Sequence, residues 1–337
     1  MSLIAIDADV LGRHRTGDET YVLNLLRALA PLTPKSGLRL AAITRHPELV
    51  PAGIEAVELS TPSQELRMAV TLPRLLRRLG ATLGHFQHAL PLRLSCPAVV
   101  TIHDLSFERD RALMGWKDRL VFRTMVPRAA RRAARVLTVS ERTRSDLMEL
   151  YRVPEERIVV TPNGVDPAFT PGGPGPHDYA LLVGAVQERK NPLAALAAAE
   201  AVGLPLVVAG PAKDADLARE LKRRGARVTG YVPQDELIEL YRGAACVLQT
   251  SRYEGFGLPV LEAMACGAPV VAVDEPALRE VGGDAAIYAS EAGLADAIRQ
   301  ALGEREQRSA SGIARARLFS WEAAARRTLE VYQEVLR

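Results

Sequence analysis

The sequence predicts an α/β fold with two domains, each built on a parallel β-sheet, and two observations lead to this prediction. Short apolar runs typical of buried strands alternate with longer amphipathic segments typical of helices along most of the chain. Parallel strands need a crossover between them, usually a helix, so this alternation favours parallel sheets. The chain has 337 residues, which suffices for two domains of roughly 100–200 residues each.

The first half contains short strands separated by helical segments of uneven length. A loop with Gly12 and Gly17 is expected between the first strand and a helix that contains Tyr21 and Leu29. Strands are expected at residues 3–7, 40–43, 56–59, 82–86, 98–102, 136–139 and 158–161, and helices at residues 116–136 and 141–151.

The second half begins after a change of composition at residues 166–178, where DPAFTPGGPGPHD is rich in proline and glycine. Such composition is typical of a linker, so we expect one at residues 169–178, between domains at residues 1–168 and 179–319. A cleft between two such domains is the usual place for a ligand. Strands are expected at residues 179–183, 205–209, 226–229, 246–250 and 269–273, and helices at residues 191–202, 214–224, 234–244, 258–266, 291–302, 304–318 and 323–336.

Bulk composition argues against several classes of protein. A formal charge of +3 is too small to indicate a nucleic-acid partner. Cys96, Cys246 and Cys266 show no CxxC spacing, so neither a disulfide framework nor a zinc site is expected, and a reducing cytosol fits. The first apolar run meets Asp7 too early for a signal peptide, and no apolar run approaches the roughly 18 residues of a membrane span. We therefore expect a cytoplasmic protein.

The strongest functional signal lies in residues 250–269, TSRYEGFGLPVLEAMACGAP. Gly255 and Gly257 form a turn between a predicted buried strand and a predicted helix. Glu254 and Glu262 flank this turn, eight positions apart. A strand, a glycine turn and a helix N-terminus with nearby acids favour a ligand that is both anionic and rich in hydroxyl groups.

A second turn carries adjacent cations. Arg189 and Lys190 follow Gly184 and a predicted strand, and they precede a predicted helix. In a parallel sheet this turn lies at the same edge as the glycine turn. Arginine supplies forked donors and lysine a point charge, so the pair suits a diphosphate. A solvated pair of surface cations is the alternative.

In the first half, His103 and Asp104 directly follow a predicted strand. Functional residues favour the carboxyl ends of strands in open parallel sheets, although a structural role for this histidine is equally open. Two arginine-rich segments also occur, residues 64–79 and a helix face with Arg128, Arg131, Arg132 and Arg135. A solvated domain surface is the favoured interpretation of both, and a peripheral membrane contact is the alternative.

Several motifs together resemble a retaining glycosyltransferase of family 4. They are YEGFGLPVLEAMACGAPVV with its two glutamates, VGAVQERKN, GYVP at residues 230–233, PNGVD at residues 162–166, IHDLSF at residues 102–107, TVSERTRSDL at residues 138–147 and the closing FSWEAAARRTLEVY. The resemblance implies the GT-B architecture, in which two Rossmann-like domains with parallel sheets face each other across a cleft. It also implies that the first domain faces the acceptor, that residues 179–319 bind the donor, and that the helix at residues 320–337 packs back on the first domain.

The resemblance implies roles for single residues. Glu254 would contact hydroxyls of the donor sugar, Glu262 would bind the ribose diol, and Arg189 with Lys190 would neutralise the leaving diphosphate. His103 would reach the transferred sugar from the other domain. Further donor-binding positions would be Gly17, Asn163, Gly184, Tyr231, Val232, Phe256, Gly257 and Leu258.

One position departs from the family pattern. Asp18 and Glu19 follow Gly17, where many relatives look like glycine plus a basic residue. Acidic groups would repel a diphosphate, so these two residues are expected to face the acceptor.

The implied reaction moves a hexose from a nucleotide-diphosphate sugar, with GDP-mannose the best match, to a hydroxyl group. We expect no metal and no other cofactor, so positive charge must come from Arg189, Lys190 and helix N-termini. UDP- or ADP-linked glucose donors, a hydrolase or epimerase of sugar nucleotides, and a non-catalytic binding protein stay open. The acceptor could be a glycan, a lipid-linked sugar or a small solute, and the enzyme could act at the inner face of the membrane.

Overall fold

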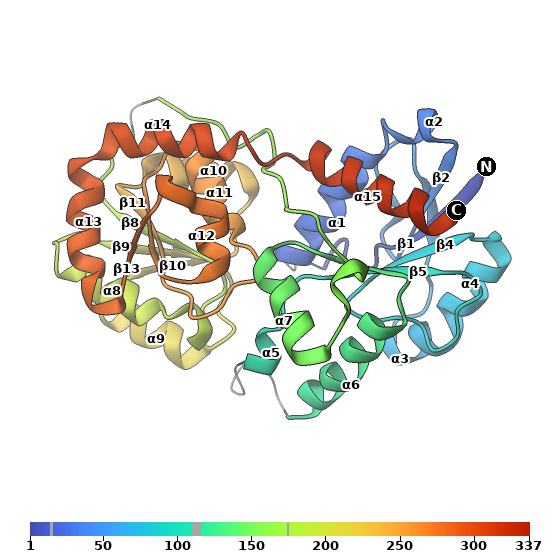
Figure 1. The fold of residues 1–337 in the computed structure, drawn as a ribbon. Helices are drawn as coiled ribbons and strands as arrows, with labels where there is room; N and C mark the ends of the chain where they lie inside the picture. The colour runs from blue at the N-terminus through green and yellow to red at the C-terminus, as the bar shows by residue number, and fades with distance from the viewer. Residues whose placement is uncertain (14–15, 110–115, 174) are drawn as a thin grey trace. The chain divides into compact units, whose positions relative to one another are not determined.

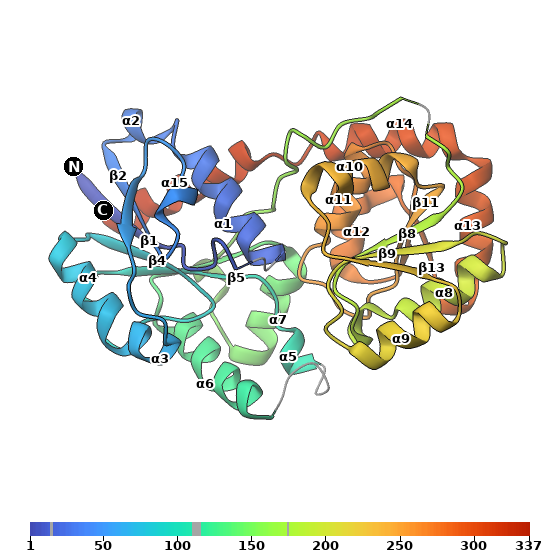
Figure 2. The ribbon, with the colours of Figure 1, turned by 180° about the vertical axis from the view of Figure 1, so that it is seen from behind.

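The computed structural model describes residues 1–13, 16–109, 116–173 and 175–337. The chain forms two compact units, the first made of Met1–Gly164 with Ser320–Arg337 and the second of Val165–Phe319. Each unit is a parallel β-sheet with helices packed on both of its faces (Figures 1 and 2). Across the described residues, no helix combines the length and the apolar character that crossing a bilayer requires.

The sheet of the first unit has seven parallel strands in the order β3-β2-β1-β4-β5-β6-β7. The order reverses between β1 and β4, which is the position where open α/β sheets bind ligands beyond the carboxyl ends of their strands. The strands are β1 Ser2–Asp7, β2 Leu38–Thr44, β3 Glu55–Glu58, β4 Leu83–Gln87, β5 Ala98–Ile102, β6 Arg135–Thr138 and β7 Ile158–Val160.

The helices of the first unit cover a core of buried aliphatic and aromatic side chains. A π-helical segment, Arg67–Thr71, joins α3 to α4. The helices are α1 Thr16–Leu29, α2 Thr33–Ser36, α3 Gln64–Leu66, α4 Leu72–Leu79, α5 Ser106–Arg109, α6 Trp116–Arg132, α7 Glu141–Tyr151 and α15 Trp321–Leu336.

The start of α1 differs from the prediction. Gly17, Asp18 and Glu19 were expected in a loop, but they form the first turn of the helix. Carboxylates are favourable there because they interact with the positive end of the helix dipole. Glu19 also accepts a hydrogen bond from the backbone N–H of Gly12 at 2.7 Å. Residues 14 and 15 of the predicted loop lie outside the described residues.

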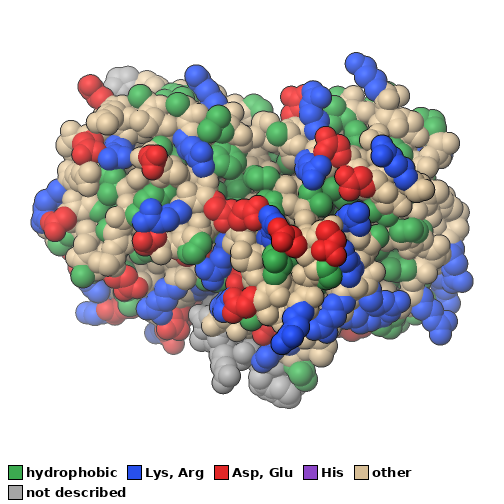
Figure 3. Space-filling model, in the orientation of Figure 1, with side chains coloured by type: hydrophobic (Ala, Val, Ile, Leu, Met, Phe, Trp, Pro, Cys, Tyr) green, Lys and Arg blue, Asp and Glu red, His purple; other side chains and the backbone are tan. Residues whose placement is uncertain are grey.

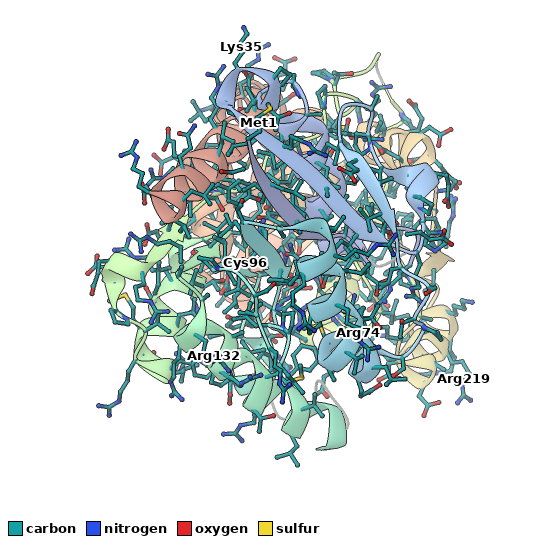
Figure 4. The ribbon with its side chains drawn as sticks, turned by 90° about the vertical axis from the view of Figure 1, so that its right-hand side faces the viewer. Met1, Lys35, Arg74, Cys96, Arg132 and Arg219 are labelled. Carbon is teal, nitrogen blue, oxygen red and sulfur yellow. The ribbon has the colours of Figure 1, made fainter. Side chains whose placement is uncertain are left out.

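Most arginines of the two arginine-rich segments lie at the surface, and Figure 3 shows Lys and Arg side chains gathered over the region of α6, whereas Arg67 of the first segment is buried. Arg74 on α4 and Arg132 on α6, both labelled in Figure 4, are exposed. The predicted helix at residues 116–136 is too long, since α6 ends at Arg132 and β6 begins at Arg135. The backbone N–H of Ala134 already donates to the carbonyl of Ala98 at 2.7 Å, so the chain has joined the sheet by this point. Arg135 therefore does not share the helix face.

The C-terminal helix α15 belongs to the first unit, where it contacts α1, β4 and β6. Ser320 is its N-cap, and its side chain accepts from the backbone N–H of Ala323 at 3.1 Å. The Tyr332 hydroxyl lies 2.6 Å from Nδ1 of His85, a buried residue of β4. Position 164 lies beside the first residue of α15 and requires glycine, because a Cβ there would be 2.0 Å from the backbone nitrogen of Trp321.

The second unit has six parallel strands in the order β10-β9-β8-β11-β12-β13. The strands are β8 Ala180–Val183, β9 Leu206–Ala209, β10 Arg227–Gly230, β11 Cys246–Gln249, β12 Val270–Val273 and β13 Ile287–Ala289. The helices are α8 Pro192–Glu200, α9 Ala215–Arg223, α10 Gln234–Gly243, α11 Leu258–Ala265, α12 Pro276–Gly282, α13 Leu294–Gly303 and α14 Arg305–Ala316.

The proline- and glycine-rich segment begins within the second unit, since the division between the units falls at Gly164 and Val165. Arg242 of α10 donates to the Thr170 carbonyl and hydroxyl, each at 2.9 Å. A Cβ on Gly172 would meet the same arginine at 2.5 Å, so this part of the predicted linker packs against α10. Residue 174 lies outside the described residues.

The strand order in the second unit reverses between β8 and β11, which pair directly. Their carboxyl ends therefore lie side by side at one edge of the sheet. The turn that follows β8 carries Arg189 and Lys190, and the turn that follows β11 carries Glu254 and the glycines. Sheet topology thus brings together two segments more than 60 residues apart in the sequence.

Candidate active site

Backbone and side-chain hydrogen bonds join the two turns at the β8–β11 edge. The Thr250 hydroxyl donates to the carbonyls of Lys190 at 2.8 Å and Asn191 at 3.0 Å. The backbone N–H of Arg252 donates to the carbonyl of Arg189 at 2.9 Å. Asn191 adopts the left-handed conformation, with φ 48°, and directly precedes α8. The cationic turn is therefore held against the glycine turn by its main chain.

Glu254 lies between the two cations. Nζ of Lys190 is 2.5 Å from its Oε1, and a terminal nitrogen of Arg189 is 3.3 Å from its Oε2. The same nitrogen of Arg189 also donates to the carbonyl of Tyr253. Glu254 is only 8% exposed, and a carboxylate this deeply buried needs opposite charges near it to stay ionised.

Glu254 is ionised at neutral pH. Burial by itself would raise the pKa of its carboxyl, but the charges of Lys190 and Arg189 outweigh that effect and lower the pKa to about 2. The edge therefore carries one fixed negative charge between two positive ones. Such a group can accept hydrogen bonds from sugar hydroxyls, and the guanidinium and ammonium groups beside it are of the kind that binds oxyanions.

Glu262 lies in the second turn of α11 and has a different environment. Its Oε2 accepts a hydrogen bond from the Tyr241 hydroxyl at 2.8 Å. Burial raises the pKa of Glu262 to about 7, although this hydrogen bond opposes the rise. The two glutamates thus differ in protonation, and Glu262 titrates near neutral pH.

The other predicted positions of the second unit surround α11 or lie on nearby turns. Gly257 directly precedes α11 with φ 115°, a conformation that favours glycine. Leu258 opens the helix, whose first N–H groups have no partner within it. Phe256 is buried with its ring 6.0 Å from that of Phe319. Gly184 lies beside Lys190, whose Cε would be 3.2 Å from a Cβ there, while Tyr231 is 57% exposed and Val232 is partly exposed.

The structure places Gly17, Asn163 and His103 in the first unit, whereas all the other predicted site residues lie in the second. Asn163 is buried after β7, and its Oδ1 has no hydrogen-bond partner within the described residues. Gly17 lies in the first turn of α1 with open space on its Cβ side. Asn163 therefore has a side-chain oxygen that a ligand could engage.

His103 follows β5 at the carboxyl edge of the first sheet and is 9% exposed. Its Nε2 lies 2.9 Å from Oε1 of Gln87, and its ring meets that of Tyr21 edge-on at 4.6 Å. Burial lowers the pKa of His103 to about 4, although Asp18 and Asp104 oppose the fall. The ring is therefore neutral at physiological pH and can both donate and accept a hydrogen bond.

His88 is a neighbour that the sequence analysis missed. Its ring centroid is 5.1 Å from that of His103, and its Nε2 lies 3.6 Å from Oδ2 of Asp18. Burial disfavours its charge, but the hydrogen bond and charge of Asp18 raise the pKa of His88 above its ordinary value. The criterion that identified His103, a position directly after a strand, could also have identified His88, which directly follows β4.

Asp18, His88 and His103 are the group among the described residues with donors suited to a metal ion. One candidate ligand atom from each lies within 4.8 Å of the others. Two imidazoles and a carboxylate would suit Zn²⁺. In the structure these side chains form hydrogen bonds or ion pairs with protein groups, Asp18 with His88 and His103 with Gln87.

Two parallel-sheet units, the second with a cationic turn and two glutamates at its switch point, define a glycosyltransferase of the GT-B class. The family model described as Glycosyltransferase Family 4 matches residues 15–169, and the one described as Glycosyl transferases group 1 matches residues 171–317. The chain belongs to glycosyltransferase family 4. It is an enzyme that transfers a sugar from a nucleotide sugar to an acceptor.

Individual proteins similar to this chain carry related names. O-antigen chain mannosyltransferase B of Escherichia coli is 34% identical over 276 residues, which cover 72% of this chain and 72% of that protein. D-inositol 3-phosphate glycosyltransferase of Kineococcus radiotolerans is 33% identical over 251 residues, covering 60% of this chain and 58% of that protein. Sucrose-phosphate synthase from Thermosynechococcus elongatus has the same fold, with a TM-score of 0.79 at 20% identity over 99% of each chain.

The raised pKa of Glu262 predicts a loss of stability as the pH rises. The unfolded chain releases this proton near the ordinary value of 4.5, whereas the folded chain holds it until about 7. Between these values the folded state binds more protons, so stability falls with rising pH. Glu262→Gln stays neutral and should lack this contribution. Relative to the variant, the wild type should lose on the order of 1–3 kcal/mol between pH 5 and pH 8.

Urea unfolding of both proteins across this pH range measures the difference. Glu239→Gln, the same change at an exposed position of α10, is the matched control and should keep the pH dependence of the wild type. Identical pH curves for wild type and Glu262→Gln would contradict the raised pKa.

Proposed function

We propose that the protein is a retaining, metal-independent hexosyltransferase that moves mannose from GDP-mannose to a hydroxyl group of its acceptor. The observation that carries this proposal is the position of Glu254 between Lys190 and Arg189 at the β8–β11 switch point. Support for mannose comes from the name of the similar O-antigen chain mannosyltransferase B.

The charges at this edge match the charges of the reaction. When the anomeric C–O bond breaks, the sugar becomes oxocarbenium-like and the diphosphate gains negative charge. Lys190 and Arg189 stabilise the diphosphate, and because their turn is tied to Thr250 and Arg252 they need little reorganisation. Ionised Glu254 accepts hydrogen bonds from the sugar hydroxyls and lies close to where positive charge develops. The acceptor hydroxyl attacks the same face, and its proton passes to the leaving phosphate.

The nucleotide is bound by groups around α11. The Glu262 carboxylate accepts hydrogen bonds from both hydroxyl groups of the ribose. Backbone N–H groups of Phe256, Gly257 and Leu258 face the sugar and phosphate at the start of the helix, where the dipole favours an anion. Gly184 permits close approach beside Lys190, while Tyr231 and Val232 frame the base.

The first unit supplies the groups that face the sugar and the acceptor. Neutral His103 hydrogen-bonds the transferred sugar, Gly17 offers its backbone near the phosphates, and Asn163 offers its buried amide. Asp18 interacts with His88, and Glu19 with the backbone of Gly12. Both carboxylates thus contact groups of the first unit, to which the proposal assigns the acceptor. A cytoplasmic location and a peripheral membrane contact through the basic surface stay predictions.

Nucleotide binding tests the donor. A ligand that binds only the folded state, present at about 100 times its dissociation constant, stabilises a protein by roughly 2.7 kcal/mol. GDP and GDP-mannose should therefore raise the melting temperature more than the UDP and ADP compounds do. Inorganic pyrophosphate is the control, since it has the charges without base or ribose. A shift with UDP or ADP and none with GDP would show that the donor is not GDP-mannose.

Substitution of Lys190 tests the mechanism. Loss of one preorganised charge-stabilising group should lower turnover on the order of 10²–10³-fold in Lys190→Ala. Lys190→Arg keeps the charge and should retain more activity, and Lys222→Ala, at an exposed position of α9, should resemble the wild type. Release of nucleoside diphosphate, with and without acceptor, measures turnover and separates transfer from hydrolysis. Near wild-type turnover of a folded Lys190→Ala protein would remove this residue from the mechanism.

Chelation tests metal independence. Because Lys190 and Arg189 supply the positive charge at the diphosphate, transfer should continue in EDTA at the rate of the untreated enzyme. A loss of activity that Mg²⁺ restores would mean that a metal shares this role. Restoration by Zn²⁺ alone would instead indicate an ion at Asp18, His88 and His103.

A further inference from the structure

An open hollow lies at the carboxyl edge of the first unit's sheet. Its volume is about 370 Å³, and Arg13, Arg45, Pro62 and Gln64 line it. Arg13 follows β1, Arg45 follows β2, and the other two residues follow β3. These three strands are neighbours in the sheet, whereas His88 and His103 follow β4 and β5. The hollow thus occupies the other half of the edge from the histidines.

Two of the four lining residues are arginines, and one buried carboxylate, that of Asp9, holds both in place. Asp9, whose side chain is 1% exposed, pairs with Arg13 and accepts from Nε of Arg45 at 2.7 Å. A third arginine, Arg67, is buried and contacts Asp9 at 2.6 Å and Asp7 at 3.2 Å. Three guanidinium groups therefore converge on two carboxylates.

The charge balance of this cluster is positive. Three cations face two carboxylates, and one of these, Asp7, also has a raised pKa, since burial outweighs the opposing charges of Arg67 and Arg13. The buried carboxylate of Asp9 fixes both Arg13 and Arg45, and both side chains line the hollow. The side chains of Arg13 and Arg45 are 20% and 31% exposed, so solvent and ligands reach them.

An oriented pair of guanidinium groups is a site for oxyanions. Arginine forks match the oxygens of a phosphate or carboxylate and bind them through charge-assisted hydrogen bonds. Gln64 adds an amide that can donate to the same group. The donor's diphosphate already has its cations in the second unit, Arg189 and Lys190, so the hollow is available to the other substrate.

We propose that this hollow binds a phosphate group carried by the acceptor, held between Arg13 and Arg45 with Gln64 beside it. The assignment rests on the proposed function, because it takes the first unit as the acceptor-binding part of a sugar transferase. It narrows the acceptor from any hydroxyl compound to a phosphorylated one. A sugar or polyol phosphate and a lipid-linked sugar diphosphate share this chemistry.

Binding of inorganic phosphate and pyrophosphate to the full chain tests the hollow without any need for activity. Titration calorimetry is done with the donor site saturated by nucleoside diphosphate, so that Arg189 and Lys190 are occupied. Arg45→Gln should weaken binding of both anions at least tenfold. Gln64→Glu should also weaken it, because it adds a negative charge to the wall and leaves the Asp9 pairs intact.

The matched control is Arg39→Gln, the same change on β2 at a side chain that is 57% exposed and pairs with Glu55. It should bind phosphate as the wild type does, and all variants should bind the nucleotide equally. Unchanged phosphate binding in both Arg45→Gln and Gln64→Glu would overturn the proposal, as would an equal loss in Arg39→Gln. Because Gln64→Glu lies outside the arginine network, misfolding of Arg45→Gln would not remove the test.

Transfer assays then identify the source of the phosphate. Wild-type kcat/KM is compared for a neutral hexose, a hexose phosphate and a polyprenyl-diphosphate-linked sugar in detergent. At least one phosphorylated acceptor should exceed the neutral one about tenfold, and Arg45→Gln should abolish that preference. Equal values for neutral and phosphorylated acceptors would overturn the acceptor assignment while leaving sugar transfer established. Absence of transfer to every acceptor, with phosphate binding as described, would contradict the proposed function instead.

Discussion

The second unit depends on the stable burial of one ionised carboxylate, that of Glu254. A buried carboxylate without partners would be protonated or would destabilise the fold. Lys190 and Arg189 prevent this, and they can do so only because β8 and β11 are neighbours in the sheet. The loops also help to keep Lys190 and Arg189 beside Glu254, because the Thr250 hydroxyl donates hydrogen bonds to carbonyls of the cationic turn. The arrangement keeps two cations and one anion at the edge without requiring solvent to neutralise them.

The first unit also surrounds a buried carboxylate with an excess of cations. Asp9 is buried and pairs with three arginines, of which Arg13 and Arg45 remain partly exposed. His88 and His103 lie farther along the same sheet edge, after β4 and β5. Burial makes His103 neutral, while Asp18 favours the charged form of His88. One half of the edge is therefore suited to an anion and the other to hydroxyl groups. A substrate that carries both kinds of group would use the whole edge.

Much of the secondary structure of the second unit follows from local signals. Strands such as β9, β11 and β12 are short and largely apolar, and they begin and end within a residue or two of the prediction. The prediction missed α12 and β13, because β13 has three residues and the helix before it ends at two glycines. The predicted helix at residues 116–136 continued into β6, since apolar residues at that junction fit either period. Residues from Arg135 onward form a strand because they pair with β5.

By itself the sequence determined the glycine turn, the helix after it, the cationic turn and the family, because each depends on residues that are adjacent in the chain. It also identified Glu254, Arg189, Lys190 and His103 as candidates from their positions after predicted strands, and Glu262 from its position in the helix after the glycine turn. Only the tertiary structure decided which of these side chains touch. Lys190 contacts Glu254, His88 contacts Asp18, and Arg67 contacts Asp9. The two residues of each pair are 58 to 70 positions apart in the sequence. Strand order in a parallel sheet sets such contacts, and strand order is a property of long-range pairing that local patterns do not contain.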